Sequence, residues 1–256
     1  MNIKGIIFDF GFTLAYFKDV SLEKYFDCFK KGLQKSVDLL KKANILEDDS
    51  YLIESFFKVF KKKRMSFFRK SVKTKLEFPT TYIFQEVLSQ TVNEGLIANL
   101  TKEFYEELAN LYHSYEENEW IPFNETRETL KKIAGSNKFK IGLLSNHPHH
   151  LTIKNILKKH DLIQFFDAVV TSAKYGKRKP HPEIFHHTLK KMGLNSDDAN
   201  YCLMCGDEYA DIIGGHRAGL KTILFEREFT FPFEKEINIS DTLRINNISE
   251  VLKHLG

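Results

Sequence analysis

Short, nearly continuous apolar segments recur along this 256-residue chain and alternate with segments of helical periodicity. A continuous apolar segment indicates a strand buried on both faces, because a strand with one solvated face alternates apolar and polar residues. Strands alternating with helices at this spacing predict βαβ units and a doubly wound parallel sheet of the α/β class. The expected strands are residues 3–10, 139–144, 168–171, 201–205, 221–225 and 242–246, and the expected helices are residues 125–134, 151–159, 182–192, 210–218 and 248–255.

Residues 21–118 break this alternation, with helical periodicity and almost no strand signal. Apolar side chains recur there at helical spacing, for example at Phe104, Leu108, Leu111 and Tyr115. The economical interpretation is an all-helical domain, residues 18–118, inserted after the first strand. Residues 1–17 and 119–256 would then form the α/β core.

The charge balance is mildly basic, with 38 basic and 34 acidic residues and a net charge of +4. These charges are interspersed except at residues 61–64 (KKKR), which we interpret as a solvated helix face. A nucleic-acid-binding protein usually carries a stronger and more clustered excess, so we expect no nucleic-acid partner.

The composition indicates a soluble globular protein, with 42% hydrophobic residues and a mean hydropathy of −0.34. No apolar segment approaches the roughly 20 residues that a membrane-spanning helix needs. The first apolar stretch stops at Asp9, too early for a secretory signal. We therefore expect a cytoplasmic protein with no membrane partner.

Cys202 and Cys205 form a C-x-x-C pair within an apolar segment. In a strand, residues three apart lie roughly 10 Å from one another and on opposite faces, whereas a disulfide tolerates about 7 Å between Cα atoms. We therefore expect buried thiols at both positions instead of a redox pair or a metal site.

Polar residues lie at or just after the carboxyl ends of three of the expected strands, where ligands bind in open parallel sheets. Asp9 lies at the end of the first expected strand, and Ser145 and Asp207 follow two others. Lys179 opens the helix that precedes the strand ending before Asp207. Each residue alone has an ordinary alternative, such as a helix cap or a solvated lysine. Together they predict a site at one sheet edge.

This set of residues suits phosphoryl transfer. Two carboxylates form a hard oxygen site for Mg²⁺, and the ion, a lysine and a hydroxyl could neutralise a phosphoryl group. A carboxylate beside them can attack phosphorus and form an aspartyl phosphate that water then hydrolyses.

Four motifs occur in an order that resembles the haloacid dehalogenase (HAD) superfamily. A further segment, GGHRAGL at residues 214–220, is also similar to that superfamily, and the resemblance covers nearly the whole predicted core. The four motifs are FDFGFTL at residues 8–14, LLSN at 143–146, GKRKPHPEIF at 176–185 and GDEYAD at 206–211.

The resemblance implies a role for each matched residue. Asp9 would be the nucleophile, Ser145 a hydrogen-bond donor to the phosphoryl group and Lys179 the neutralising cation. Mg²⁺ would be held by Asp9, Asp207 and the backbone carbonyl of Gly11. The resemblance also implies that the helical insert is a cap of the C1 type, which closes over the site and supplies substrate selectivity.

Supporting roles fall to neighbouring residues. We expect Thr13 and Asn146 to contact substrate. Asp211 lies one helical turn after Asp207 and could orient Lys179, help to hold the metal or simply favour the helix N-terminus. Glu208 could bind a metal-bound water.

Gly11 departs from the family pattern, because HAD phosphatases usually carry there a second aspartate that serves as general acid and base. Such help is typically worth 10²–10⁴-fold in rate, so we expect substrates with good leaving groups to react disproportionately well. His147 could substitute as the acid, although a solvated loop histidine is the plainer interpretation.

Three hypotheses about function remain open at this point. The leading one is a Mg²⁺-dependent phosphatase acting on a small phosphorylated metabolite, as a monomer or a homodimer. The first alternative is a metal-independent 2-haloacid dehalogenase, which also lacks the second aspartate. Asp207 argues against it, because a carboxylate beside Asp9 without a metal would repel an anionic substrate. The second alternative is a HAD-fold binding protein whose catalysis has decayed.

Overall fold

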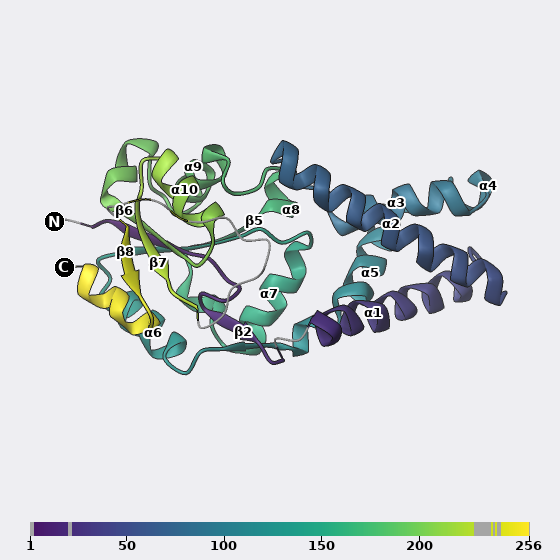
Figure 1. Cartoon of the computed structure of the whole chain (residues 1–256), viewed down its shortest axis with the longest axis horizontal. Coiled ribbons are helices and arrows are strands. Elements are labelled where there is room, and N and C mark those ends of the chain that lie inside the picture. The colour runs from purple at the N-terminus through teal and green to yellow at the C-terminus, as the bar shows by residue number, and fades with distance from the viewer. Residues whose placement is uncertain (1–2, 20–21, 228–236, 238, 240–241, 256) are drawn as a thin grey trace.

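The computed structural model of the chain describes residues 3–19, 22–227, 237, 239 and 242–255, with the backbone alone for residues 22–26. The main sheet of this described part has six parallel strands in the order β5-β4-β1-β6-β7-β8 (Figure 1). The strands are β1 (Gly5–Phe8), β4 (Lys140–Ser145), β5 (Ala168–Thr171), β6 (Cys202–Gly206), β7 (Lys221–Phe225) and β8 (Leu243–Ile245). The predicted doubly wound α/β class is confirmed.

The strand order reverses direction at β1, which pairs with β4 on one side and β6 on the other. The register places Phe8 opposite Leu143 and Cys205, so the three strands end at nearly the same level. A ligand site is expected in the crevice outside such a switch point, at the carboxyl ends of the strands.

Helices cover both faces of the sheet (Figure 1). Ile6 and Phe8 pack with residues of α6 (Thr126–Gly135), α7 (His150–Lys159) and η4 (Ile248–His254), whereas Ile7 packs with residues of α9 (Pro182–Lys191). This alternation along β1 is what a strand buried on both faces requires. The remaining elements of the core are α10 (Tyr209–Arg217), which contacts α9, β6 and β7, together with α8 (Ser172–Tyr175), η2 (Ile163–Phe165) and η3 (Ser196–Tyr201).

Residues 22–118 are helical, as their periodicity predicts, and lie beside the sheet layers (Figure 1). Phe60 packs against Phe84 and Tyr112, with ring centroids 4.8 and 5.1 Å away, which joins three helices in one aromatic core. The elements are α1 (Leu22–Lys42), α2 (Ser50–Thr74), α3 (Thr80–Thr91), α4 (Glu94–Ile97), α5 (Lys102–His113) and η1 (Glu116–Asn118).

The basic run at residues 61–64 is only partly the solvated face that the sequence suggests. Lys63 pairs with Glu86 at 3.2 Å, and the Arg64 guanidinium lies 5.5 Å from the ring centroids of Phe29 and Tyr112. A guanidinium can stack on aromatic faces while it keeps its charge, which explains its inward placement.

A two-stranded antiparallel sheet of β2 (Ala15–Phe17) and β3 (Trp120–Pro122) joins the two chain segments that enter and leave the helical region. Strands of three residues are too short to give an alternating pattern, which is why the sequence did not predict them. The pair places Trp120 opposite Phe17, close to the residues that follow β1.

The predicted burial of the two cysteines is confirmed. Cys205 packs in the same cluster as Ile6, and Cys202 packs in the cluster of Ile7 on the other face; both are free thiols. Within the described ranges, none of the helices combines the length and the apolar character needed to cross a bilayer.

Candidate active site

The carboxyl ends of β1, β4 and β6 bring the predicted site residues together. Asp9, Ser145, Lys179 and Asp207 are all buried, with 8%, 7%, 4% and 5% of their surfaces exposed. Lys179 reaches this edge from the loop between α8 and α9, and its Nζ lies 2.5 Å from Asp9 Oδ1. Residues about 170 positions apart in the chain therefore meet at one buried point.

Lys179 is held from several sides. Its ammonium also lies 2.6 Å from Asp211 Oδ1 and donates a hydrogen bond to the Leu144 carbonyl at 2.9 Å. The Asn146 side chain fixes its backbone, since Oδ1 accepts from Lys179 N at 2.8 Å and Nδ2 donates to Lys179 O at 3.1 Å. Asn146 thus positions the lysine, while its expected contact with substrate stays a prediction.

Asp207 has a protein partner at each carboxylate oxygen. Thr13 Oγ1 donates to Oδ1 at 2.7 Å, and Arg227 Nε lies 3.1 Å from Oδ2. Thr13 therefore contacts the expected metal ligand. Arg227 was not predicted to belong to the site, although it lies just beyond the carboxyl end of β7, where ligands bind in open parallel sheets.

Asp211 is a member of the site because Gly206 makes room for it. A Cβ atom at position 206 would lie 2.3 Å from Asp211 Cγ, so any larger residue there would displace the carboxyl group. Asp211 and Glu208 also form a capping box at the start of α10, with Glu208 N donating to Asp211 Oδ2 at 3.1 Å. Asp211 thus contacts Lys179 and caps α10, while each of the three roles considered for it in the site stays a prediction.

Burial and neighbouring negative charges raise the pKa values of the Asp9 and Asp207 carboxyl groups. Burial, together with the neighbouring Asp211 and Glu208 carboxylates, raises the pKa of Asp9 to about 7, although Lys179 acts in the opposite direction. Burial and Asp9 likewise raise the pKa of Asp207 well above its ordinary value. The pKa of Lys179 is raised, because Asp211 and Asp9 outweigh the lowering effect of its burial.

Asp9, Asp207 and Asp211, here called the carboxylate cluster, offer oxygen atoms that all lie within 4.8 Å of one another. Asp207 Oδ2 and Asp211 Oδ1 are buried, and the nearby cations are not aligned with them as hydrogen-bond donors. Hard carboxylate oxygens crowded in this way are the ligands that Mg²⁺ prefers. The residues present therefore fit a divalent cation.

The space beside Gly11 is filled by an aromatic ring. A Cβ atom at this position would lie 3.0 Å from Trp120 Cη2, and the indole packs edge-on against Phe10 and Phe12 with centroids 5.3 and 5.2 Å apart. Phe12 has a left-handed φ of 59°, which is uncommon for a residue with a side chain. The indole thus blocks the direction in which a second aspartate would extend.

His147 belongs to a second group, the buried His113 and Glu116 with the partly buried His147, here called the histidine cluster. Glu116 Oε2 lies 2.6 Å from His113 Nδ1, and Glu116 Oε1 lies 3.1 Å from His147 Nε2. The remaining nitrogens contact Thr80 Oγ1 and the backbone of His149. Both nitrogens of His147 are therefore engaged by the protein.

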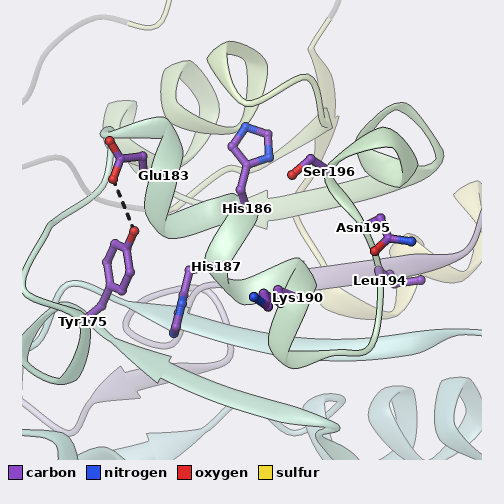
Figure 2. A pocket seen from close by; sticks show the side chains of 8 residues that line it. All are labelled: Tyr175, Glu183, His186, His187, Lys190, Leu194, Asn195 and Ser196. Carbon is purple, nitrogen blue, oxygen red and sulfur yellow. Dashed lines mark hydrogen bonds between the residues drawn. The ribbon is translucent and has the colours of Figure 1, made fainter.

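Two hollows differ in their relation to these clusters, since only the smaller one is lined by members of the histidine cluster. A cavity of about 120 Å³ lies where the helical region meets the loop after β4, and its lining includes Arg64, Glu116, Asn146, His147 and Arg178. A larger, open hollow of about 430 Å³ lies along α9 (Figure 2) and contains none of the predicted site residues. It is lined by Tyr175, Glu183, His186, His187, Lys190, Leu194, Asn195 and Ser196.

Comparison with known sequences gives a family and a set of relatives. A family model described as haloacid dehalogenase-like hydrolase matches residues 43–225. Pyrophosphatase PpaX from Bacillus cereus (strain AH820) is 34% identical over 118 residues, which are 46% of this chain and 51% of that protein. PpaX from Bacillus mycoides (strain KBAB4) is also 34% identical, over 119 residues. The chain thus spans about half the length of the curated relatives it matches.

Solved structures share the fold over the whole chain. A 2-haloacid dehalogenase from Pseudomonas syringae pv. Tomato DC3000 has a TM-score of 0.62 at 19% identity, covering 99% of this chain and 98% of that one. A HAD phosphatase from Thermococcus onnurineus gives 0.58 at 21% identity, covering 99% and 98%. The HAD-hydrolase YfnB from Bacillus subtilis, solved bound to magnesium, gives 0.56 at 18% identity, covering 100% and 99%.

Proposed function

Because the chain belongs to the haloacid dehalogenase-like hydrolases, we propose that it is a Mg²⁺-dependent phosphatase acting on a small phosphorylated metabolite. The observation that carries this proposal is the contact of Asp9 with Lys179 inside a cluster of three buried carboxylates. The curated relatives are named as pyrophosphatases, which supports reaction at phosphorus. Three buried thiols suit a reducing compartment, so we place the enzyme in the cytoplasm.

Asp9 is the nucleophile in this proposal. One of its oxygens attacks phosphorus, so an O–P bond forms while the bond from phosphorus to the leaving oxygen breaks, and water then releases phosphate. Lys179 favours the ionised form of Asp9 and would also offset charge on the transferring group, as would the Ser145 hydroxyl. A divalent cation held by Asp9, Asp207 and the Gly11 carbonyl would neutralise phosphoryl charge.

The helical region has a matching role. We propose that residues 18–118 form a cap over the core of residues 1–17 and 119–256. The 120 Å³ cavity supports this assignment, because it is lined from both sides, by Arg64 of α2 and by Asn146 of the loop after β4. Side chains of the cap would then contact the part of the substrate that does not react.

The test is hydrolysis of p-nitrophenyl phosphate in Mg²⁺ and in EDTA, by wild type and by Asp9→Asn. Removal of a nucleophile costs at least about 10³-fold in rate, so we expect Mg²⁺-dependent release that Asp9→Asn abolishes. Asp197→Asn, at an exposed position, is the matched control and should hydrolyse at the wild-type rate. Equal release by Asp9→Asn would remove Asp9 from the mechanism.

Gly11 adds a second arm to this test. An alkyl phosphate needs a proton at its leaving oxygen, whereas p-nitrophenolate does not. Because the indole of Trp120 fills the space of the usual acid, we expect the alkyl ester to be slower by about 10²-fold or more. Equal rates would show that another side chain supplies the proton.

A 2-haloacid dehalogenase is the second candidate, and two observations favour it. Position 11 lacks the aspartate, and Arg227 supplies Asp207 with a cation that belongs to the protein itself. Halide release from 2-chloropropionate in EDTA would support this candidate. Phosphate binding with neither reaction would instead indicate a binding protein.

A further inference from the structure

Arg227 and Asp207 form a buried ion pair at the edge of the carboxylate cluster. Their side chains are 5% and 1% exposed, and Nε of the guanidinium lies 3.1 Å from Asp207 Oδ2. The guanidinium also lies 5.7 Å from the ring centroid of Phe12, so an aromatic face supports it. The guanidinium is therefore held by Asp207 and by the Phe12 ring, and the pair is not an accidental contact between two surface groups.

The oxygen that Arg227 contacts belongs to the set that fits a divalent cation. The other oxygen of Asp207 accepts a hydrogen bond from Thr13, so Asp207 offers no carboxylate oxygen without a protein partner. A guanidinium stays charged at all accessible pH values, and repulsion between it and a divalent ion is strong in a buried site. The guanidinium and a divalent metal ion therefore cannot occupy the same side of Asp207 at the same time.

We propose that Arg227 is a competing cation that holds Asp207 until a divalent metal ion displaces it. The inference rests on the proposed function only in that it places the metal at Asp207. Its consequence is a metal affinity set by two equilibria, since the guanidinium must leave before the ion can bind. Apparent affinity falls in proportion to the fraction of molecules in which Asp207 is accessible.

The neighbouring residues indicate which part moves. Glu226 pairs with Arg244 of β8 at 2.6 Å, and its backbone N–H donates to the Ile245 carbonyl at 2.8 Å. The backbone beside Arg227 is thus tied to the sheet, and the displacement belongs to the arginine side chain.

The experiment is titration of the metal-free protein with MgCl₂, followed by isothermal calorimetry, in wild type and Arg227→Gln. We expect Arg227→Gln to bind Mg²⁺ about tenfold more tightly, because the competing cation is gone. Arg217→Gln removes an exposed arginine of α10 and should leave the dissociation constant at its wild-type value. An unchanged or weaker affinity in Arg227→Gln, or no binding by either protein, overturns the proposal.

Arg227→Lys serves if the glutamine variant does not fold. It keeps the positive charge and loses the planar fork, so its affinity should lie between those of wild type and Arg227→Gln. A wild-type affinity in Arg227→Lys would also overturn the proposal. Because binding is measured without substrate, tighter binding by Arg227→Gln together with no phosphatase activity would refute the proposed function alone.

Discussion

The carboxylate cluster is buried and the histidine cluster is buried except for the partly buried His147. Both offer three ligating side chains, but they differ in how their charges are matched. Glu116 meets an imidazole at each oxygen, and the pKa of its carboxyl group is lowered well below its ordinary value because His147 and His113 outweigh its burial. Asp9 lies near other carboxylates, and burial raises its pKa to about 7.

This difference separates structural from chemical roles. A buried polar network whose members all have partners rigidifies the protein around it. A buried cluster with an excess of negative charge destabilises the fold around it. Ionisable groups whose pKa values are shifted in this way are concentrated at functional sites. The comparison supports placing the chemistry at Asp9 and a structural role at Glu116, between the helical region and the loop after β4.

The largest effect should come from Lys179→Met. This change leaves the Asp9 and Asp211 carboxylates buried without their shared ammonium, which costs about 3–5 kcal/mol in the free energy of unfolding. It should also lower phosphatase activity by about 10³-fold, because the transferring group loses its cation. Urea denaturation and p-nitrophenyl phosphate hydrolysis measure the two effects.

Lys177→Met is the control for that variant. Lys177 pairs with Glu183, and their side chains are 32% and 53% exposed. Surface pairs contribute little, so stability should change by less than about 1 kcal/mol. If both lysine variants lost similar activity, Lys179 would have no special role.

Glu116→Gln tests the other side of the comparison. The variant removes the negative charge that faces two imidazoles and the Trp120 indole, and it puts an amide NH₂ donor in place of one acceptor oxygen, which should cost about 2–4 kcal/mol in the free energy of unfolding. The Mg²⁺ dissociation constant should stay within about twofold of wild type, because none of these groups belongs to the carboxylate cluster. A large loss of Mg²⁺ affinity would show that the two clusters are coupled.

The smallest effect is on the pH dependence of stability, where the clusters act in opposite directions. Folding raises the pKa of Asp9 from 3.8 to about 7, so in this window its carboxyl group binds more protons in the native state than in the unfolded state. The contribution of Asp9 to the free energy of unfolding therefore falls as pH rises from 3.8 to about 7. Burial lowers the pKa of His113 from 6.5 to about 4, so its contribution is lost as pH falls through that window.

Urea denaturation in EDTA at pH 5 and pH 7 measures how the free energy of unfolding changes with pH in wild type and in variants of Asp9 and His113. Asp9→Asn should gain stability relative to wild type on going from pH 5 to pH 7, by about 1–2 kcal/mol. His113→Gln should lose stability relative to wild type over the same interval, by a similar amount. Slopes of the same sign in both variants would contradict the assignment of opposite charge environments.

Much of the fold was predictable because it depends on local patterns. The bounds of β5 and β7 agree with the prediction, since each is a short apolar segment between polar residues. β1 begins at Gly5 and ends at Phe8, inside the expected range of 3–10, because the chain turns after Phe10, whose carbonyl accepts from Leu14 N and Ala15 N. The apolar pattern of the segment continues through this turn, so the pattern alone does not reveal where the strand ends.

The candidate site was predictable only in part. The motifs predicted that Asp9, Lys179 and Asp207 lie together, because parallel strands end at a common edge. Arg227 was missed because it lies in none of the motifs, although it follows the carboxyl end of β7 and contacts Asp207. Glu116 was missed because its role depends on His147, and a sequence gives no sign of which buried charges meet.

Trp120 gives the protein its own optical probe. It is the single tryptophan of the chain, and its indole packs against Phe10 and Phe12 on either side of Gly11 and lies 3.4 Å from Glu116 through Nε1. Fluorescence excited at long wavelength therefore originates from one ring between the nucleophile's loop and the helical region. Without any label, the emission reports on the surroundings of this ring and on no other part of the protein.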